Sequence, residues 1–274
     1  LKLGIEAESL KRITSGIKYA LIQISYNGHS CTILQNLEEF VINLLGISID
    51  DVESGIIHLK AKGEIVIEDR DDDTEWVYLE SFYNTEVAIC NRLNKLDETE
   101  NSKKVKGIKN EMKRVEKENE IELSEKQKEA VQAVNDNNVT IITGGPGTGK
   151  TTIIKSIIEI YIKQNNKIVL AAPTGRAAKR MTEMTGIEAS TLHRLLEIGK
   201  INDDGLYKKS QDYQGAPIDA DIVIVDEMSM VDMFLMNYLL QSVYLGTKLV
   251  LVGDSDQLPS VGPGSVLQDI IESG

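Results

Sequence analysis

The feature that most constrains the fold is a glycine-rich turn between an apolar run and a helical pattern. Residues 139–143 are rich in β-branched side chains, and the sequence Gly-Gly-Pro-Gly-Thr-Gly-Lys-Thr follows them at 144–151. These eight residues, the phosphate loop, match the pattern Gly-x-x-x-x-Gly-Lys-(Ser or Thr). Glycines let successive backbone N–H groups curl around phosphate oxygens, and a helix N-terminus adds a positive dipole end. The segment therefore predicts an α/β domain that binds a phosphorylated ligand.

The side chains of the phosphate loop predict a nucleoside triphosphate. Lys150 can reach the β- and γ-phosphates, and the Thr151 hydroxyl can bind Mg²⁺. A tight strand-to-helix turn without a ligand is the structural alternative. We expect ATP and Mg²⁺ as cofactors, held by Gly145, Pro146, Gly147, Thr148, Gly149, Lys150, Thr151 and Thr152.

Apolar runs downstream predict a parallel sheet. Residues 167–171, 221–225 and 248–252 are nearly continuous in apolar side chains and are separated by helical patterns. Such strands are typical of a sheet that is covered by helices on both faces. The predicted fold class is therefore α/β, with a phosphate-loop domain over residues 123–274.

Polar residues follow two of these runs. Asp226 and Glu227 come directly after the strand at 221–225, and Gln257 lies shortly after the strand at 248–252. Ligands bind at the carboxyl ends of parallel strands, so these groups should lie beside the phosphate loop. We expect Asp226 to hold Mg²⁺, Glu227 to polarise the attacking water and Gln257 to contact the terminal phosphate. With Lys150 they form the predicted catalytic set.

Residues 1–92 have a different pattern. Apolar side chains recur at helical spacing to about residue 63, and residues 64–68 and 75–79 then read as a hairpin. The pattern predicts a mostly helical, winged-helix-like accessory domain; a plain packing domain with a surface hairpin is the alternative. Residues 93–122 carry dense mixed charge and are expected to form a linker or solvated helix.

Charge and composition limit the function classes. The net charge of −13 argues against a nucleic-acid partner by itself, although a local site remains compatible with it. No apolar stretch approaches the ~18 residues of a membrane span, so no membrane partner is expected. Two cysteines without metal-ligand spacing favour a cytoplasmic location.

Gln127 has two interpretations. It lies three residues after Ser124, as in a capping box at a helix start. It can equally read the edge of an adenine base. The residues alone leave both open.

Five segments of the sequence form a recognisable set. They are 144–151 (Gly-Gly-Pro-Gly-Thr-Gly-Lys-Thr), 172–180 (Ala-Pro-Thr-Gly-Arg-Ala-Ala-Lys-Arg), 191–196 (Thr-Leu-His-Arg-Leu-Leu), 226–230 (Asp-Glu-Met-Ser-Met) and 253–264 (Gly-Asp-Ser-Asp-Gln-Leu-Pro-Ser-Val-Gly-Pro-Gly). Together they resemble RecD-type superfamily 1 helicases, which use ATP to move 5′ to 3′ on single-stranded DNA. The resemblance covers about residues 121–274 and implies that the phosphate-loop domain at 123–274 is RecA-like. Residues 1–92 also look like the accessory domain of stand-alone members.

The resemblance implies roles for individual residues, and it implies a second domain that is not part of this sequence. It makes Gln127 the adenine contact and places Thr174, Arg176 and His193 in segments that touch DNA; a purely structural role for His193 stays open. Residues 198–218 resemble a strand-separating hairpin, in which Tyr207 and Tyr213 could stack on bases or pack on the hairpin itself. Family members continue into a second RecA-like domain, so the sequence ending at Gly274 is expected to be truncated.

The expected function is that of an ATP-dependent 5′-to-3′ DNA helicase in recombination or repair, acting on single-stranded or 5′-tailed duplex DNA. The 274 residues alone are expected to have little activity. Protein partners stay unknown. One alternative is a nucleotide-switched DNA- or protein-binding module that does not translocate, and another is a phosphate-loop kinase acting on a metabolite.

Overall fold

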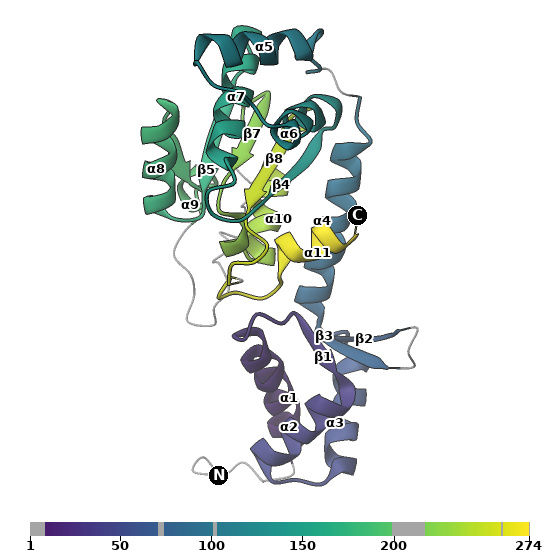
Figure 1. The fold of residues 1–274 in the computed structure, drawn as a ribbon. Coiled ribbons are helices and arrows are strands. Elements are labelled where there is room, and N and C mark those ends of the chain that lie inside the picture. Colours follow the sequence, from purple (N-terminus) through teal and green to yellow (C-terminus); the bar gives the residue numbers. More distant parts are fainter. Residues whose placement is uncertain (1–8, 71–73, 101–102, 199–216, 259, 274) are drawn as a thin grey trace. The chain divides into compact units, whose positions relative to one another are not determined.

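The computed structural model describes residues 9–70, 74–100, 103–198, 217–258 and 260–273 (Figure 1). The chain divides into two compact units. The first comprises residues 1–88 with 260–265, and the second comprises residues 89–259 with 266–274. The predicted hairpin insertion, with Tyr207 and Tyr213, lies almost wholly outside the described residues.

The first unit packs helices against a small antiparallel sheet. Its helices are α1 (Leu10–Ser25), α2 (Leu34–Leu45), α3 (Ile49–Ala61) and the beginning of α4 (Glu80–Asp97). The strands β1 (Cys31–Ile33), β3 (Glu75–Leu79) and β2 (Ile65–Asp69) pair in that order. The β2–β3 pair is the hairpin that the sequence predicts, whereas β1 was not anticipated. Ile17, Leu37 and Val77 are fully buried in the core between helices and sheet.

The second unit is built on a parallel sheet, and the predicted α/β fold class is confirmed. In its described residues five strands pair in the order β4-β8-β7-β5-β6. Their bounds are β4 Val139–Thr143, β5 Ile168–Ala172, β6 Ala189–Thr191, β7 Ile222–Val225 and β8 Lys248–Gly253. Every strand pair is parallel, so all five strands end at the same edge, here called the carboxyl edge. β7 and β8 are buried along their whole length, as continuous apolar runs predict.

The helices of the second unit connect and cover these strands (Figure 1). They are α5 (Ile108–Glu118), α6 (Glu125–Asp136), α7 (Lys150–Lys163), α8 (Gly175–Thr185), α9 (Leu192–Leu195), the 3₁₀ turn η1 (Met228–Met230), α10 (Met233–Ser242) and α11 (Val266–Ser273). No described helix combines the length and the apolar character needed to cross a membrane.

The charged segment 93–122 contributes to the core of the second unit. Its helix α5 buries Ile108, Met112 and Val115, which recur at helical spacing and join the apolar core around α6 and α7. Charged residues occupy its other faces, for example Glu111 and Arg114, whose Oε2 and Nε atoms are 2.8 Å apart. A helix with high charge is therefore docked through a narrow apolar stripe.

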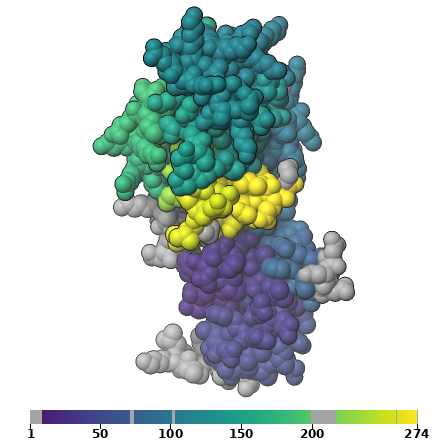
Figure 2. Space-filling model, in the orientation of Figure 1, coloured from purple at the N-terminus to yellow at the C-terminus, as the bar shows by residue number. Residues whose placement is uncertain are grey.

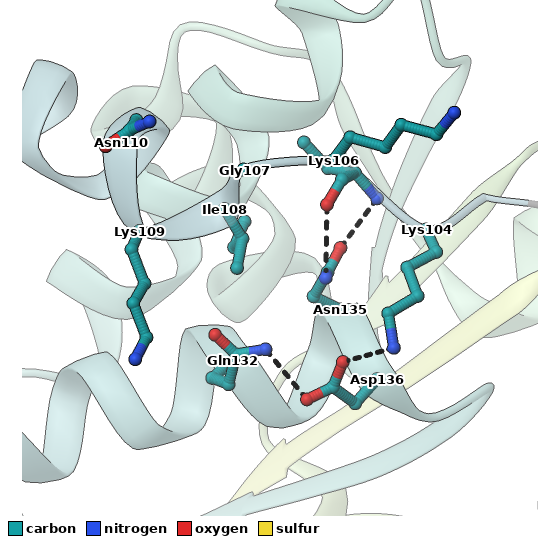
Figure 3. Close-up of a pocket in the computed structure, with 10 residues that line it drawn as sticks. Lys104, Lys106, Gly107, Ile108, Lys109, Asn110, Gln132, Asn135 and Asp136 are labelled. Carbon is teal, nitrogen blue, oxygen red and sulfur yellow. Dashed lines mark hydrogen bonds and ion pairs between the residues drawn. The ribbon is translucent and has the colours of Figure 1, made fainter.

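Residues 104–110 and α6 line an open pocket of about 540 Å³ (Figure 3). Its walls include Lys104, which pairs with Asp136 at 2.7 Å, and Asn135, whose Oδ1 accepts the Val105 N–H at 2.7 Å. These contacts fasten the segment before α5 to the end of α6. Asn135 and Asp136 precede β4, so the pocket lies at the amino ends of the strands and not at the carboxyl edge. The polar side chains of Lys104, Asn135 and Asp136 are thus explained by the contacts that hold the segment before α5 against α6.

Lys248 is a fully buried lysine at the start of β8. Its Nζ donates hydrogen bonds to the carbonyl oxygens of Val134, Asn135 and Asn137 at 2.8, 3.2 and 2.7 Å. These carbonyls lie at the C-terminal end of α6, where side-chain donors commonly satisfy the last backbone carbonyls. The amine therefore caps α6 and joins it to the sheet. Burial lowers the pKa of Lys248 to about 8.

We predict that Lys248→Met lowers the free energy of unfolding by about 1–3 kcal/mol, because three carbonyls, of which those of Val134 and Asn135 are buried, lose their donor. The pH profile gives a second readout. An unfolded lysine has a pKa near ~10.4, so between pH 8 and that value the unfolded chain binds more protons. The free energy of unfolding should rise with pH in this window for the parent chain, and this rise should be absent in the variant.

Urea denaturation at pH 7, 8, 9 and 10 measures both effects. Lys167→Met is the matched control, because the Lys167 side chain is 58% exposed and pairs with Asp219 at the surface. Equal stabilities of the Lys248 and Lys167 variants would contradict the capping role.

Candidate functional site at the carboxyl edge

The strand order arranges the predicted site residues along the carboxyl edge. The phosphate loop follows β4, Gln257 follows β8, and Asp226 follows β7. Thr174 then follows β5, and His193 follows β6. The structure therefore brings the predicted nucleotide residues together on three neighbouring strands. The predicted DNA contacts lie beyond them on the other two strands.

The phosphate loop has the backbone conformation that a phosphate cradle needs. Gly147 and Gly149 have φ angles of +76° and +86°, which residues with a Cβ seldom adopt. Gly149 is the N-cap of α7 and provides no side chain to cap the first turn. The Lys150 amine donates to the carbonyl oxygens of Gly144 and, at 3.1 Å, of Gly145. Lys150 thus lies over its own loop, where a phosphate oxygen can replace these carbonyls.

Gln127 begins α6 and also contacts the phosphate loop. Its Oε1 accepts the Ser124 N–H at 2.9 Å, while the Ser124 Oγ accepts the Gln127 N–H at 3.4 Å. The predicted capping box is therefore confirmed. A Cβ atom on Gly149 would overlap with Gln127 Nε2, so the amide lies directly against the loop. The adenine contact stays a prediction.

Asp226 is partly buried where β7 ends. Burial raises the pKa of its carboxyl group, and the Glu227 N–H, Lys150 and Arg180 oppose this shift. The Glu227 N–H donates to Asp226 Oδ1 at 2.9 Å. A carboxylate that is costly to bury, held one loop away from Lys150, is typical of a functional site rather than of a structural ion pair.

Glu227 has a strained backbone. Its φ angle is +57°, a left-handed conformation that is uncommon for residues other than glycine. It starts the η1 turn immediately after β7. Its Oε1 lies 3.9 Å from Arg180 Nη1 on α8. The strain places the carboxylate at the carboxyl edge instead of continuing the strand.

Gln257 has a partner that sequence analysis missed. The Ser229 hydroxyl donates to Gln257 Oε1 at 3.2 Å. Ser229 belongs to the Asp-Glu-Met-Ser-Met segment quoted above, but a serine in a short polar turn gives no signal for a particular role. The three-dimensional arrangement of β7 and β8 is what reveals the contact.

The residues predicted to contact DNA are placed on α8 and α9. Thr174 is the N-cap of α8, and its Oγ1 accepts the Ala177 N–H at 3.3 Å. Arg176 is exposed in the first turn of the same helix, and His193 is half-buried in α9. α8 lies in the green part of the surface in Figure 2. The Thr174 hydroxyl is thus already used as a helix cap, while Arg176 is accessible.

The carboxyl edge can hold a metal-bound polyphosphate. The described residues contain no group of three or more His, Cys, Asp or Glu side chains that would bind a metal alone. Mg²⁺ commonly takes one or two protein oxygens together with substrate phosphates and water. The Thr151 hydroxyl and the Asp226 carboxylate supply such oxygens, so the residues present fit the ion. The phosphate loop with Lys150 and the loop with Gln257 follow the neighbouring strands β4 and β8 at this edge.

Comparison with known proteins gives the family. A family model described as AAA domain matches residues 127–263, which is half of the chain. The RecBCD enzyme subunit RecD of Mycolicibacterium smegmatis is 38% identical over 171 residues, covering 54% of this chain and 30% of that protein. The ATP-dependent RecD2 DNA helicase of Deinococcus radiodurans is 42% identical over 142 residues, covering 52% of this chain and 19% of that protein.

A solved structure of Pif1 helicase from Bacteroides in complex with ADP-AlF3 and single-stranded DNA aligns with a TM-score of 0.37 and 28% identity. The alignment covers 56% of this chain and 37% of that one. The chain thus spans less than a third of the length of the two RecD relatives that it matches. It belongs to the AAA domain family, and the resemblance to RecD-type helicases that its motifs predict is confirmed by these relatives.

Proposed function

We propose that this chain provides the nucleotide-binding motor domain and the accessory domain of a RecD-like DNA helicase, with MgATP bound at the carboxyl edge. The observation that carries the proposal is the convergence of three strand ends. The parallel register aligns Thr143 with Gly253, and Val225 with Leu251. These pairings support a common site for the phosphate loop, the acidic pair and Gln257.

The residues have distinct roles in the proposed reaction. Lys150 leaves the carbonyls of its own loop and binds the β- and γ-phosphates. Thr151 and Asp226 hold Mg²⁺, which supplies positive charge to the phosphate oxygens when bound. Glu227 accepts a proton from the attacking water, and Gln257 donates a hydrogen bond to the terminal phosphate. Positioning and charge stabilisation are the main requirements of phosphoryl transfer.

We further propose that the β5 and β6 side of the edge binds a single DNA strand. Arg176 supplies a positive charge for a phosphate, and Thr174 and His193 flank the strand. The net charge of −13 does not exclude this, because binding depends on the local groove. We also propose that the helicase moves from 5′ to 3′ and acts in recombination or repair. The proposed location is the cytoplasm, with which the free thiols of Cys31 and Cys90 are compatible.

The extent of the match limits what this chain does alone. Since it matches 30% or less of each RecD relative, we assign to it the nucleotide site and one part of the DNA-binding surface. In the proposed arrangement a second RecA-like domain supplies the arginines that complete catalysis. The 274 residues should therefore bind MgATP but turn it over slowly.

Binding of a fluorescent ATP analogue tests the nucleotide site. We predict that Lys150→Ala weakens binding in Mg²⁺ by about 10- to 100-fold, the range expected when a charged hydrogen bond is lost. Lys155→Ala, an exposed lysine on the same helix, is the matched control and should bind normally. Glu227→Gln should keep the affinity of the parent chain and lose the residual phosphate release. Unchanged binding by Lys150→Ala would reject the proposal that ATP binds at the carboxyl edge.

Asp226→Asn should stabilise the chain without nucleotide while weakening MgATP binding. Because burial raises the pKa of Asp226, the folded chain holds this proton more tightly than the unfolded chain. Its contribution to the free energy of unfolding therefore falls as the pH rises through the raised pKa. We expect the variant to melt above the parent at pH 8, because the asparagine side chain carries no charge that burial penalises.

Thermal unfolding at pH 5 and pH 8 measures this effect, and the gain should be larger at pH 8. An equal or lower melting temperature of the variant at pH 8 would show that the charged Asp226 carboxylate does not destabilise the folded chain.

Arg176→Ala tests the DNA surface. The variant should bind a labelled oligothymidylate several-fold more weakly, and the slope of log affinity against log salt should fall by about 1, as for one lost phosphate contact. Lys117→Ala is the matched control, because Lys117 is an exposed cation on α5, which packs on α6 and α7 rather than on β5. Fluorescence anisotropy at several salt concentrations gives both values. Equal losses in the two variants would indicate nonspecific electrostatic binding only.

A further inference from the structure

The contact between Ser229 and Gln257 joins the two loops that follow β7 and β8. Ser229 lies in the η1 turn and is 9% exposed, whereas Gln257 is exposed. The Ser229 hydroxyl donates to Gln257 Oε1 at 3.2 Å. One end of the carboxamide is therefore held by a buried group on the neighbouring loop.

The other end of the carboxamide faces Asp254. Gln257 Nε2 donates to Asp254 Oδ2 at 3.5 Å, and Asp254 is itself 3% exposed. The second carboxylate oxygen of Asp254 accepts the Asp256 N–H at 3.1 Å. A carboxylate can only accept hydrogen bonds, so it selects the NH₂ end of the amide, and Ser229 then donates to the carbonyl end. Both contacts favour the same orientation.

Backbone geometry brings the two loops together. A Cβ atom on Gly253 would lie 2.6 Å from Leu267 Cδ2 and 3.3 Å from Met228 Cβ, so the η1 turn packs directly on the end of β8. The left-handed conformation of Glu227 turns the chain into η1 immediately before that contact. The position of Ser229 is thus fixed by a close approach and a strained residue, and does not result from a free surface rotamer.

We propose that Ser229 is a positioning residue that fixes the carboxamide of Gln257 and thereby lets the site distinguish a nucleoside triphosphate from a diphosphate; this rests on the proposed nucleotide site. An amide nitrogen carries two N–H groups. Asp254 uses one, and the other stays available for an oxygen of the γ-phosphate. The reversed amide would present a carbonyl oxygen to the phosphate and would repel it.

The proposal also explains why the contact comes from this turn. Ser229 is two residues after Glu227, so the residue that orients the phosphate contact and the predicted catalytic carboxylate belong to the same turn. Gain or loss of the terminal phosphate then changes the contacts of Gln257, and the Ser229–Gln257 hydrogen bond passes this change to η1. The sheet does not have to rearrange.

Calorimetric titration of the 274-residue chain with ADP and with the non-hydrolysable triphosphate AMP-PNP, both in Mg²⁺, tests the proposal. Ser229→Ala should weaken AMP-PNP binding by about 2- to 10-fold, the usual value of one hydrogen bond, and leave ADP binding unchanged. Ser229→Thr, which keeps the hydroxyl group, should restore most of the preference. Gln257→Ala, at an exposed position, should show the same selective loss, and the double variant should lose no more than Gln257→Ala alone.

Several outcomes would overturn the proposal. Equal loss of ADP and AMP-PNP affinity in Ser229→Ala would indicate a structural role, and additive losses in the double variant would show that the two side chains act independently. A selective loss in Gln257→Ala but not in Ser229→Ala would leave Gln257 as the contact and reject Ser229. Failure of the parent chain to bind either nucleotide would reject the proposed function itself, which the Lys150 variant tests separately.

Discussion

The parallel pairing of five strands is the constraint on which the rest of the second unit depends. Because β4, β8, β7, β5 and β6 all run in one direction, every loop that carries a predicted site residue emerges at the same edge. At the opposite edge, polar contacts hold the segments before β4 against the sheet. The buried Lys248 amine caps α6, and Asp221 Oδ1 pairs with Lys103 at 2.6 Å.

The carboxyl edge holds two arrangements that lower stability. Glu227 has a left-handed backbone, and the Asp226 carboxylate is partly buried. In the proposed function a bound cation offsets the cost of the buried carboxylate, because the charge then has a partner. Such local costs are typical of functional sites, since a sequence selected for stability alone would remove them.

The sequence predicts the site better than it predicts the architecture around it. The phosphate loop, the apolar strands and the capping box at Ser124 each depend on local patterns of a few residues, and all are present in the structure. β6 was missed because three residues, Ala-Ser-Thr, form an edge strand without an apolar run. The burial of Lys248 and the Ser229–Gln257 contact depend on which strands become neighbours, and a single sequence does not specify that order.

The strand order also bears on how the two halves of the edge communicate. β7 separates β8, on the nucleotide side, from β5, where the predicted DNA residues begin. The ion pair between Arg180 and Glu227 crosses this boundary at 3.9 Å, but the Arg180 side chain is 66% exposed, and exposed pairs contribute little free energy. The second link across this boundary is a backbone hydrogen bond, in which the Asp226 N–H donates to the Ala171 carbonyl oxygen of β5 at 3.0 Å. This bond is part of the sheet, so it holds the start of the Asp226 loop at a fixed position beside the strand that precedes Thr174.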